Sequence, residues 1–137
     1  MKPPPHIIAA LVAATHEPTS TLFFTPVRLR ARIDGWSPDK QRLYVAGIAA
    51  TGRADRAAAL CHASPQSAAR LRHRPDAASF VAACCAAFGL SKQARWDARA
   101  RQQEAARLAA ARDVVRGFAA SLRGEGSKGA EGAKGSF

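Results

Sequence analysis

The segment Ala54–His73 constrains the fold more than any other part of the chain, because it has the pattern of two short helices joined by a tight turn. Ser64 and Pro65 stand where the second helix would begin, and these residue types start helices well. Small apolar residues recur at positions that would face inward in both helices. We therefore expect a helix-turn-helix. Its expected buried residues are Ala57, Ala58, Cys61, Ala63, Ala68 and Leu71.

Capping residues predict further helices on both sides of this segment. Ser37 followed by Pro38 favours the start of a helix, and Gly52 favours its end. Asp76 can cap a later helix, which we expect to stop at Gly89. The expected helices are 38–50, 54–61, 65–73, 77–88 and 91–122, with a short two-turn helix also expected over Ile7–Ala14.

Apolar spacing indicates which faces of these helices are buried. In the first helix of the folded region, Tyr44, Val45 and Ile48 share one face, and Trp36 can pack onto it from before the cap. In the helix 77–88, one face is expected to cover the three helices before it. That face consists of Phe80, Cys84 and Phe88.

These elements predict an all-α protein with a trihelical helix-turn-helix core, a covering fourth helix and a long C-terminal helix. We expect a flexible basic arm over residues 1–35, the helix-turn-helix domain over 36–89, a long helix rich in Ala and Arg over 90–123, and a disordered tail over 124–137. In the arm, Arg28, Arg30 and Arg32 occupy every second position. The arm either contacts DNA, at its phosphates or in a minor groove, or is a solvated linker.

The charge of the chain favours a polyanionic partner. Lys and Arg number 21 against 10 Asp and Glu, which gives a net charge of +11. Each phosphate that such a protein contacts releases condensed counterions, so nucleic acid is the expected partner. No apolar run reaches the ~18 residues of a membrane span. The 3 cysteines are an odd number, which indicates a reducing compartment, and we expect a cytoplasmic, nucleoid-associated protein.

The helix that begins at Pro65 is the candidate DNA-reading element. If Ala68 and Leu71 face inward, Gln66, Arg70 and His73 face outward, since successive residues turn by about 100°. Gln bonds adenine and Arg bonds guanine in bidentate geometry, and Ala69 could meet a thymine methyl group. Near the helix start, Ser64 and Ser67 suit phosphate or base contacts, and at its end Arg72 and Arg74 suit the phosphate backbone.

The region from Trp36 to Phe80 resembles small bacterial helix-turn-helix proteins of the homeodomain-like superfamily, which include short regulators, transposase DNA-binding domains and terminase small subunits. The resemblance rests on Thr51–Gly52 at the end of the first helix, on Ala57–Ala58 in the second, and on Leu71–Arg74 at the end of a Ser-capped recognition helix. It implies duplex DNA as the partner. His62 occupies the turn position where glycine is usual, since the backbone there has a positive φ.

Other chemistry is not indicated by the sequence. Cys61, His62 and His73 do not have the spacing of zinc ligands, and Cys84–Cys85 has no second cysteine pair to complete a metal site. No catalytic triad or phosphate-binding glycine loop is apparent. We expect no metal, no cofactor and no enzymatic activity.

The long C-terminal helix carries an apolar seam with heptad-like spacing. The seam either packs back on the domain or forms a homodimer contact, and we favour the homodimer. Its residues are Leu108, Ala111, Val115, Phe118 and Leu122.

The expected function is sequence-specific binding of double-stranded DNA by a transcriptional regulator. Two alternatives stay open. The first is a DNA-recognition subunit of a phage or mobile element, and the second is a protein-interaction module with a degenerate helix-turn-helix.

Overall fold

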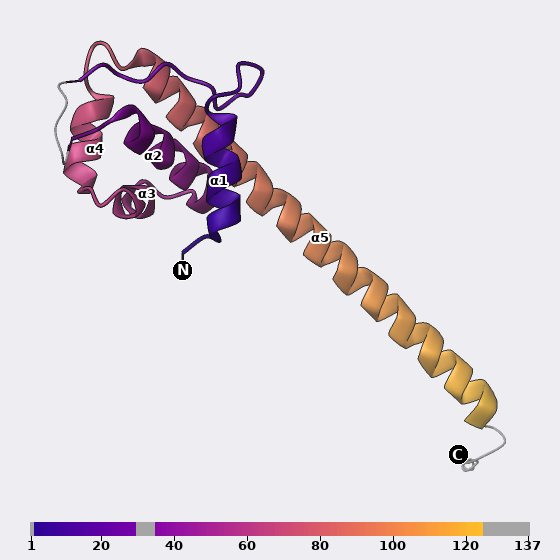
Figure 1. The fold of residues 1–137 in the computed structure, drawn as a ribbon. Helices are drawn as coiled ribbons and strands as arrows, with labels where there is room; N and C mark the ends of the chain where they lie inside the picture. The colour runs from indigo at the N-terminus through magenta and orange to yellow at the C-terminus, as the bar shows by residue number, and fades with distance from the viewer. Residues whose placement is uncertain (1, 30–34, 125–137) are drawn as a thin grey trace. The chain divides into compact units, whose positions relative to one another are not determined.

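The computed structural model describes residues 2–29 and 35–124. Within these ranges the only regular secondary structure is α-helix (Figure 1). The predicted all-α class is confirmed. The helices are α1 (Pro5–Ala14), α2 (Pro38–Thr51), α3 (Ala54–Leu60), α4 (Pro65–Arg72) and α5 (Ala78–Gly124). The chain divides into two compact units, Met1–Arg95 and Trp96–Phe137.

The capping residues act as the sequence predicts. The Ser37 hydroxyl accepts a hydrogen bond from the Lys40 amide at 3.2 Å, and the Ser64 hydroxyl accepts one from the Ser67 amide at 3.1 Å. Both serines precede a proline that begins the helix. Gly52 ends α2 in the left-handed region at φ 70°. These local signals place α2 and α4 within one residue of their expected bounds.

The turn between α3 and α4 depends on His62, whose φ is 55°. His62 is the one non-glycine residue with a positive φ in the described part of the chain. The Ala63 amide then donates to the Ala58 carbonyl at 2.9 Å, which closes the turn. The sharp change of direction expected between the two helices is therefore present, although histidine stands where glycine would carry less strain.

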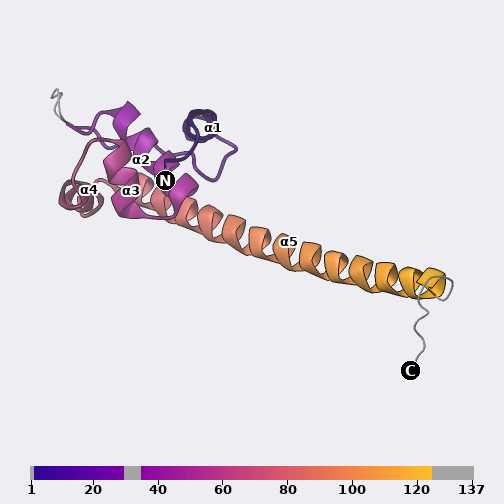
Figure 2. The same cartoon turned by 90° about the horizontal axis from the view of Figure 1, so that it is seen from below.

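Within the first unit, α2 and α3 lie between α1 and α4 (Figures 1 and 2). Helix α2 approaches α3 closely at Gly47, where an added Cβ would lie 3.0 Å from the Cα of Ala57. Aromatic rings form the centre of the core: Tyr44 lies 5.5 Å from Trp36 and 5.8 Å from Phe80, centroid to centroid. Phe80 in turn lies 5.6 Å from Phe24.

The N-terminal region corrects the expectation of a flexible arm over residues 1–35. Its α1 packs against α2, and the segment that follows buries Leu22, Phe24 and Val27 in the core. Arg42 of α2 donates to the Thr15 carbonyl at 2.9 Å and so ties the end of α1 to the domain. The apolar run around Phe24 is therefore part of the core. The sequence did not indicate this burial, because the partner Phe80 lies far along the chain.

A buried amide holds the second half of this region in place. The Gln41 side chain accepts a hydrogen bond from the Val27 amide at 2.8 Å and donates to the carbonyls of Val27 and Trp36, each at 2.9 Å. Gln41 is fully buried, and these three bonds use its acceptor and both of its donors. It joins the segment before residue 30 to the segment after residue 34.

The expected break at Gly89 is absent, because α5 runs through this residue without interruption. A glycine inside a helix costs about 1 kcal/mol relative to alanine, which neighbouring helix formers offset. Asp76 does not directly precede the helix; its carboxylate pairs with Arg74. The buried face of α5 also differs from the prediction, since Phe88 is 39% exposed. The buried residues are Phe80, Ala83, Cys84, Ala87 and Ser91.

Candidate nucleic-acid interface

Helix α4 has one buried side and one exposed side, as its sequence predicts. Ala68 and Leu71 are buried, with 1% and 3% of their surface exposed. Gln66, Arg70 and His73 are exposed, and Ala69 beside them is partly buried. No acidic residue occurs between Ser64 and Arg74. The outward side of α4 is therefore polar and basic, a surface suited to phosphates and base edges.

The start of α4 is anchored by Trp36, a role that the sequence analysis did not find. The indole Nε1 of Trp36 donates to the Ser67 hydroxyl at 2.9 Å, and the Lys40 ammonium lies 5.3 Å from the centre of the indole ring. Trp36 is 9% exposed, and a buried indole N–H needs an acceptor, which is the signal that could have indicated this contact.

Two of the predicted contact residues are thus partly engaged in the fold. The Ser67 hydroxyl accepts a hydrogen bond from Trp36, and the Ser64 hydroxyl caps α4. Both hydroxyls therefore already have a structural role in the fold. Both residues keep some exposure to solvent: Ser64 is exposed and Ser67 is intermediate.

Arg72 corrects the expectation of a backbone contact at the flank of α4. Its guanidinium donates to the Tyr44 hydroxyl and lies 6.0 Å from the centre of the Tyr44 ring. Burial raises the pKa of Tyr44 above its usual value, while the nearby Arg72 charge lowers it in part. Arg72 therefore joins the end of α4 to α2 and the core. A helical projection of α4 alone could not show this contact.

Arg74 is exposed, but an acidic neighbour engages it. Its Nε donates to the Asp76 carboxylate at 2.9 Å, and a second bond forms at 3.0 Å. The hydrogen bond from Arg74 lowers the pKa of the Asp76 carboxyl. An exposed pair of this kind contributes little to stability, so a phosphate can compete for Arg74.

Of the predicted contact residues, Gln66, Arg70 and His73 are exposed and lie near one another. They lie on the outward side of α4, and their side chains make no hydrogen bond or ion pair with another residue in ranges 2–29 and 35–124. Side chains held on a rigid helix with free donors are what base recognition requires.

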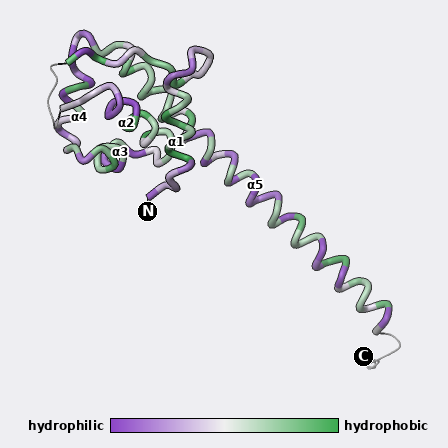
Figure 3. Tube along the Cα trace, in the orientation of Figure 1, coloured by the Kyte–Doolittle hydropathy of each residue, from purple (hydrophilic) through white to green (hydrophobic). Residues whose placement is uncertain are grey.

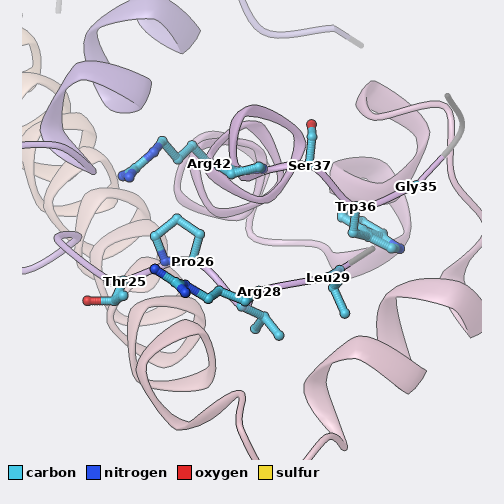
Figure 4. Close-up of a pocket in the computed structure, with 10 residues that line it drawn as sticks. Thr25, Pro26, Arg28, Leu29, Gly35, Trp36, Ser37 and Arg42 are labelled. Atoms are coloured by element: carbon cyan, nitrogen blue, oxygen red, sulfur yellow. The ribbon is translucent and has the colours of Figure 1, made fainter. Parts of the chain in front are cut away.

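The predicted arm residues are only partly described. Arg28 is exposed and, together with Arg42, lines a cavity of about 620 Å³ beside Trp36 (Figure 4). Arg30 and Arg32 lie outside the described residues. Arg28 can reach solvent from a segment that Gln41 holds through Val27.

Among the residues that the structure describes, the remaining reactive side chains do not gather into a site. No cluster of His, Cys, Asp and Glu suited to a metal ion occurs within the described ranges. Burial raises the pKa of the Cys61 and Cys84 thiols to about 12, whereas Cys85 is exposed. Across the same ranges, no helix combines the length and the hydropathy needed to cross a bilayer.

Comparison of the chain with known protein families, curated proteins and solved structures found no match.

Proposed function

We propose that this protein binds double-stranded DNA at a preferred sequence, with α4 in the major groove. The observation that carries this proposal is the outward side of α4, where Gln66, Arg70 and His73 are exposed and unengaged on a helix with no acidic residue. A recognition helix of this kind follows a sharp turn, and here the turn is at His62.

Each open side chain has a chemical role in this proposal. Arg70 donates two hydrogen bonds to guanine O6 and N7, and Gln66 pairs with adenine N6 and N7. Ala69 contacts a thymine methyl group, and His73 contacts the sugar-phosphate backbone or a base edge at the end of the helix.

The rest of the unit supplies support and positioning. Trp36 fixes the start of α4 through Ser67, and Tyr44 holds its end through Arg72. A helix anchored at both ends enters a groove without the entropic cost of ordering its backbone. Arg28 and Arg74 contact phosphates, which set register and carry no sequence information.

The biological role that we assign to this binding is regulation of transcription in the cytoplasm. A recognition subunit of a phage or mobile element would use the same contacts but would assemble into rings of many subunits. Capture of one protein partner without affinity for DNA would instead indicate a protein-interaction module.

Selection of duplexes from a randomised pool, followed by fluorescence anisotropy on the selected duplex, tests the proposal. Arg70→Ala should weaken binding to the selected duplex by about 5- to 150-fold, because a bidentate contact contributes about 1–3 kcal/mol of discrimination. Its binding to scrambled duplexes should change much less. The control Arg99→Ala removes the same charge from exposed α5 and should leave the preference intact.

Absence of any enriched sequence, or an equal loss on selected and scrambled duplexes in Arg70→Ala, would contradict sequence reading by α4.

A further inference from the structure

The part of α5 within the second unit exposes an unusual amount of apolar surface. Between residues 108 and 123, five large apolar side chains are between 53% and 71% exposed. Hydrophilic and hydrophobic residues alternate along this part of the helix (Figure 3). The exposed apolar residues are Leu108, Val114, Val115, Phe118 and Leu122. An apolar stripe of this kind on a helix marks a contact surface.

The spacing of the stripe matches one helix packing along another. Leu108, Ala111, Val115, Phe118 and Leu122 alternate in steps of three and four residues, which corresponds to heptad positions a and d. Val114 and Ala119 stand at flanking positions and widen the stripe. Such a face is covered by a second helix of the same spacing.

We propose that a second copy of this chain covers the stripe from Ala111 to Leu122, with the two α5 helices antiparallel. This inference is independent of DNA binding. A self-complementary surface is what a two-fold symmetric dimer requires. The size and the charge of the residues in and beside the stripe select the orientation.

A parallel pair in register would place identical residues opposite each other. Phe118 would face Phe118 of the second copy, and this layer would be crowded. Ala111 would face Ala111, and this layer would leave a void. Arg107 would lie beside Arg112 of the second copy on both edges, and like charges in this position repel.

An antiparallel pair removes both conflicts when Val115 lies opposite Phe118 of the second copy. In this register Ala111 faces Leu122, so each layer combines a larger side chain with a smaller one. Arg112 then lies beside Ala119 of the second copy, so the Arg107–Arg112 contact of the parallel pair is avoided. The apolar layers 111–122 are continuous across the pair.

Analytical ultracentrifugation of the full chain tests self-association. The protein should sediment as a monomer-dimer mixture at concentrations up to about 500 μM, since short heptad pairs associate weakly. Phe118→Glu should be monomeric throughout. Ala120→Glu is the matched control, because it adds the same charge outside the seam and should still dimerise. A monomer at every concentration, or equal loss in both variants, would overturn the proposal.

Disulfide trapping tests the orientation. In a Cys85→Ser background, which removes the exposed thiol, Ala111→Cys mixed with Leu122→Cys should form a covalent heterodimer on oxidation. Neither variant alone should cross-link. Cross-linking of Ala111→Cys with itself would show a parallel pair and reject the antiparallel arrangement.

Discussion

At the scale of single residues, Gln41 is a buried polar side chain that joins two separate segments of the chain. It is fully buried, and its amide satisfies the N–H and the C=O of Val27 together with the Trp36 carbonyl. The cost of a buried group that loses its partner is about 1–3 kcal/mol. Gln41 thus links the N-terminal region to the residue that anchors α4.

Gln41→Leu should lower the free energy of unfolding by about 2–4 kcal/mol, because it leaves backbone groups of Val27 and Trp36 without partners inside the protein. Urea denaturation followed by circular dichroism measures this change. Gln66→Leu, the same substitution at an exposed position, should change stability by less than about 0.5 kcal/mol. Similar losses in both variants would refute the role of Gln41.

The buried thiols predict how stability depends on pH. Burial raises the pKa of Cys61 and Cys84 to about 12, from an ordinary value of 9.0. Above pH 9 the unfolded chain therefore loses these protons while the folded chain keeps them. The stabilisation is fully present below pH 9 and is lost between pH 9 and 12.

Urea midpoints measured from pH 8 upward should fall beyond pH 9, and Cys84→Ala should show a shallower fall than the parent protein. Cys85→Ala is the matched control, since it removes a thiol that is exposed in the fold. A midpoint that stays constant up to pH 11 would contradict the burial of these thiols.

At the scale of helices, the sequence predicted most of what is local and less of what is distant. Ser37 and Ser64 indicated the starts of α2 and α4, because a cap depends on residues three positions away. The turn at His62 was expected from the two helices on either side of it, although histidine stands where glycine is usual. The placement of Phe24 against Phe80 could not be predicted, since it depends on two segments far apart in the chain.

In the candidate site, too, local features were predicted and contacts with distant residues were not. The period of α4 predicted the burial of Ala68 and Leu71 and the exposure of Arg70. The period could not show that Arg72 turns to Tyr44, because that contact depends on α2. Gly89 was interpreted as a helix end from its residue type alone, although the helix formers on both sides of it outweigh one glycine.

Gly47 makes the packing of α2 on α3 testable, and Gly89 in α5 serves as its comparison. A Cβ at Gly47 would lie 3.0 Å from the backbone Cα of Ala57 and 3.2 Å from Leu60, so Gly47→Ala must push the two helices apart. We expect a loss of about 1–3 kcal/mol, although alanine is the better helix former. Nothing lies within 4 Å of a Cβ at Gly89, so Gly89→Ala should stabilise α5 by up to about 1 kcal/mol.

Thermal unfolding of both variants measures the two effects, which should have opposite signs. Stabilisation by Gly47→Ala would show that α2 and α3 are farther apart than the structure indicates.

At the scale of the whole molecule, the proposed DNA contact and the proposed dimer make a joint prediction. Two linked DNA-reading units bind two half-sites more tightly than one, because the second contact becomes intramolecular. A duplex with two copies of the selected sequence, at a series of spacings, should at one spacing bind the protein at least about tenfold more tightly than a duplex with one copy.

Phe118→Glu should remove this gain without changing affinity for the single-copy duplex, since Phe118 lies in the second unit and Gln66 and Arg70 lie in the first. Ala120→Glu carries the same added charge and should keep the gain. Net charge is +11, so every measurement is made at one salt concentration, because counterion release alone changes affinity steeply. If Phe118→Glu weakens binding to both duplexes equally, the seam contributes to DNA affinity without joining two copies, and the link between dimer and half-sites fails.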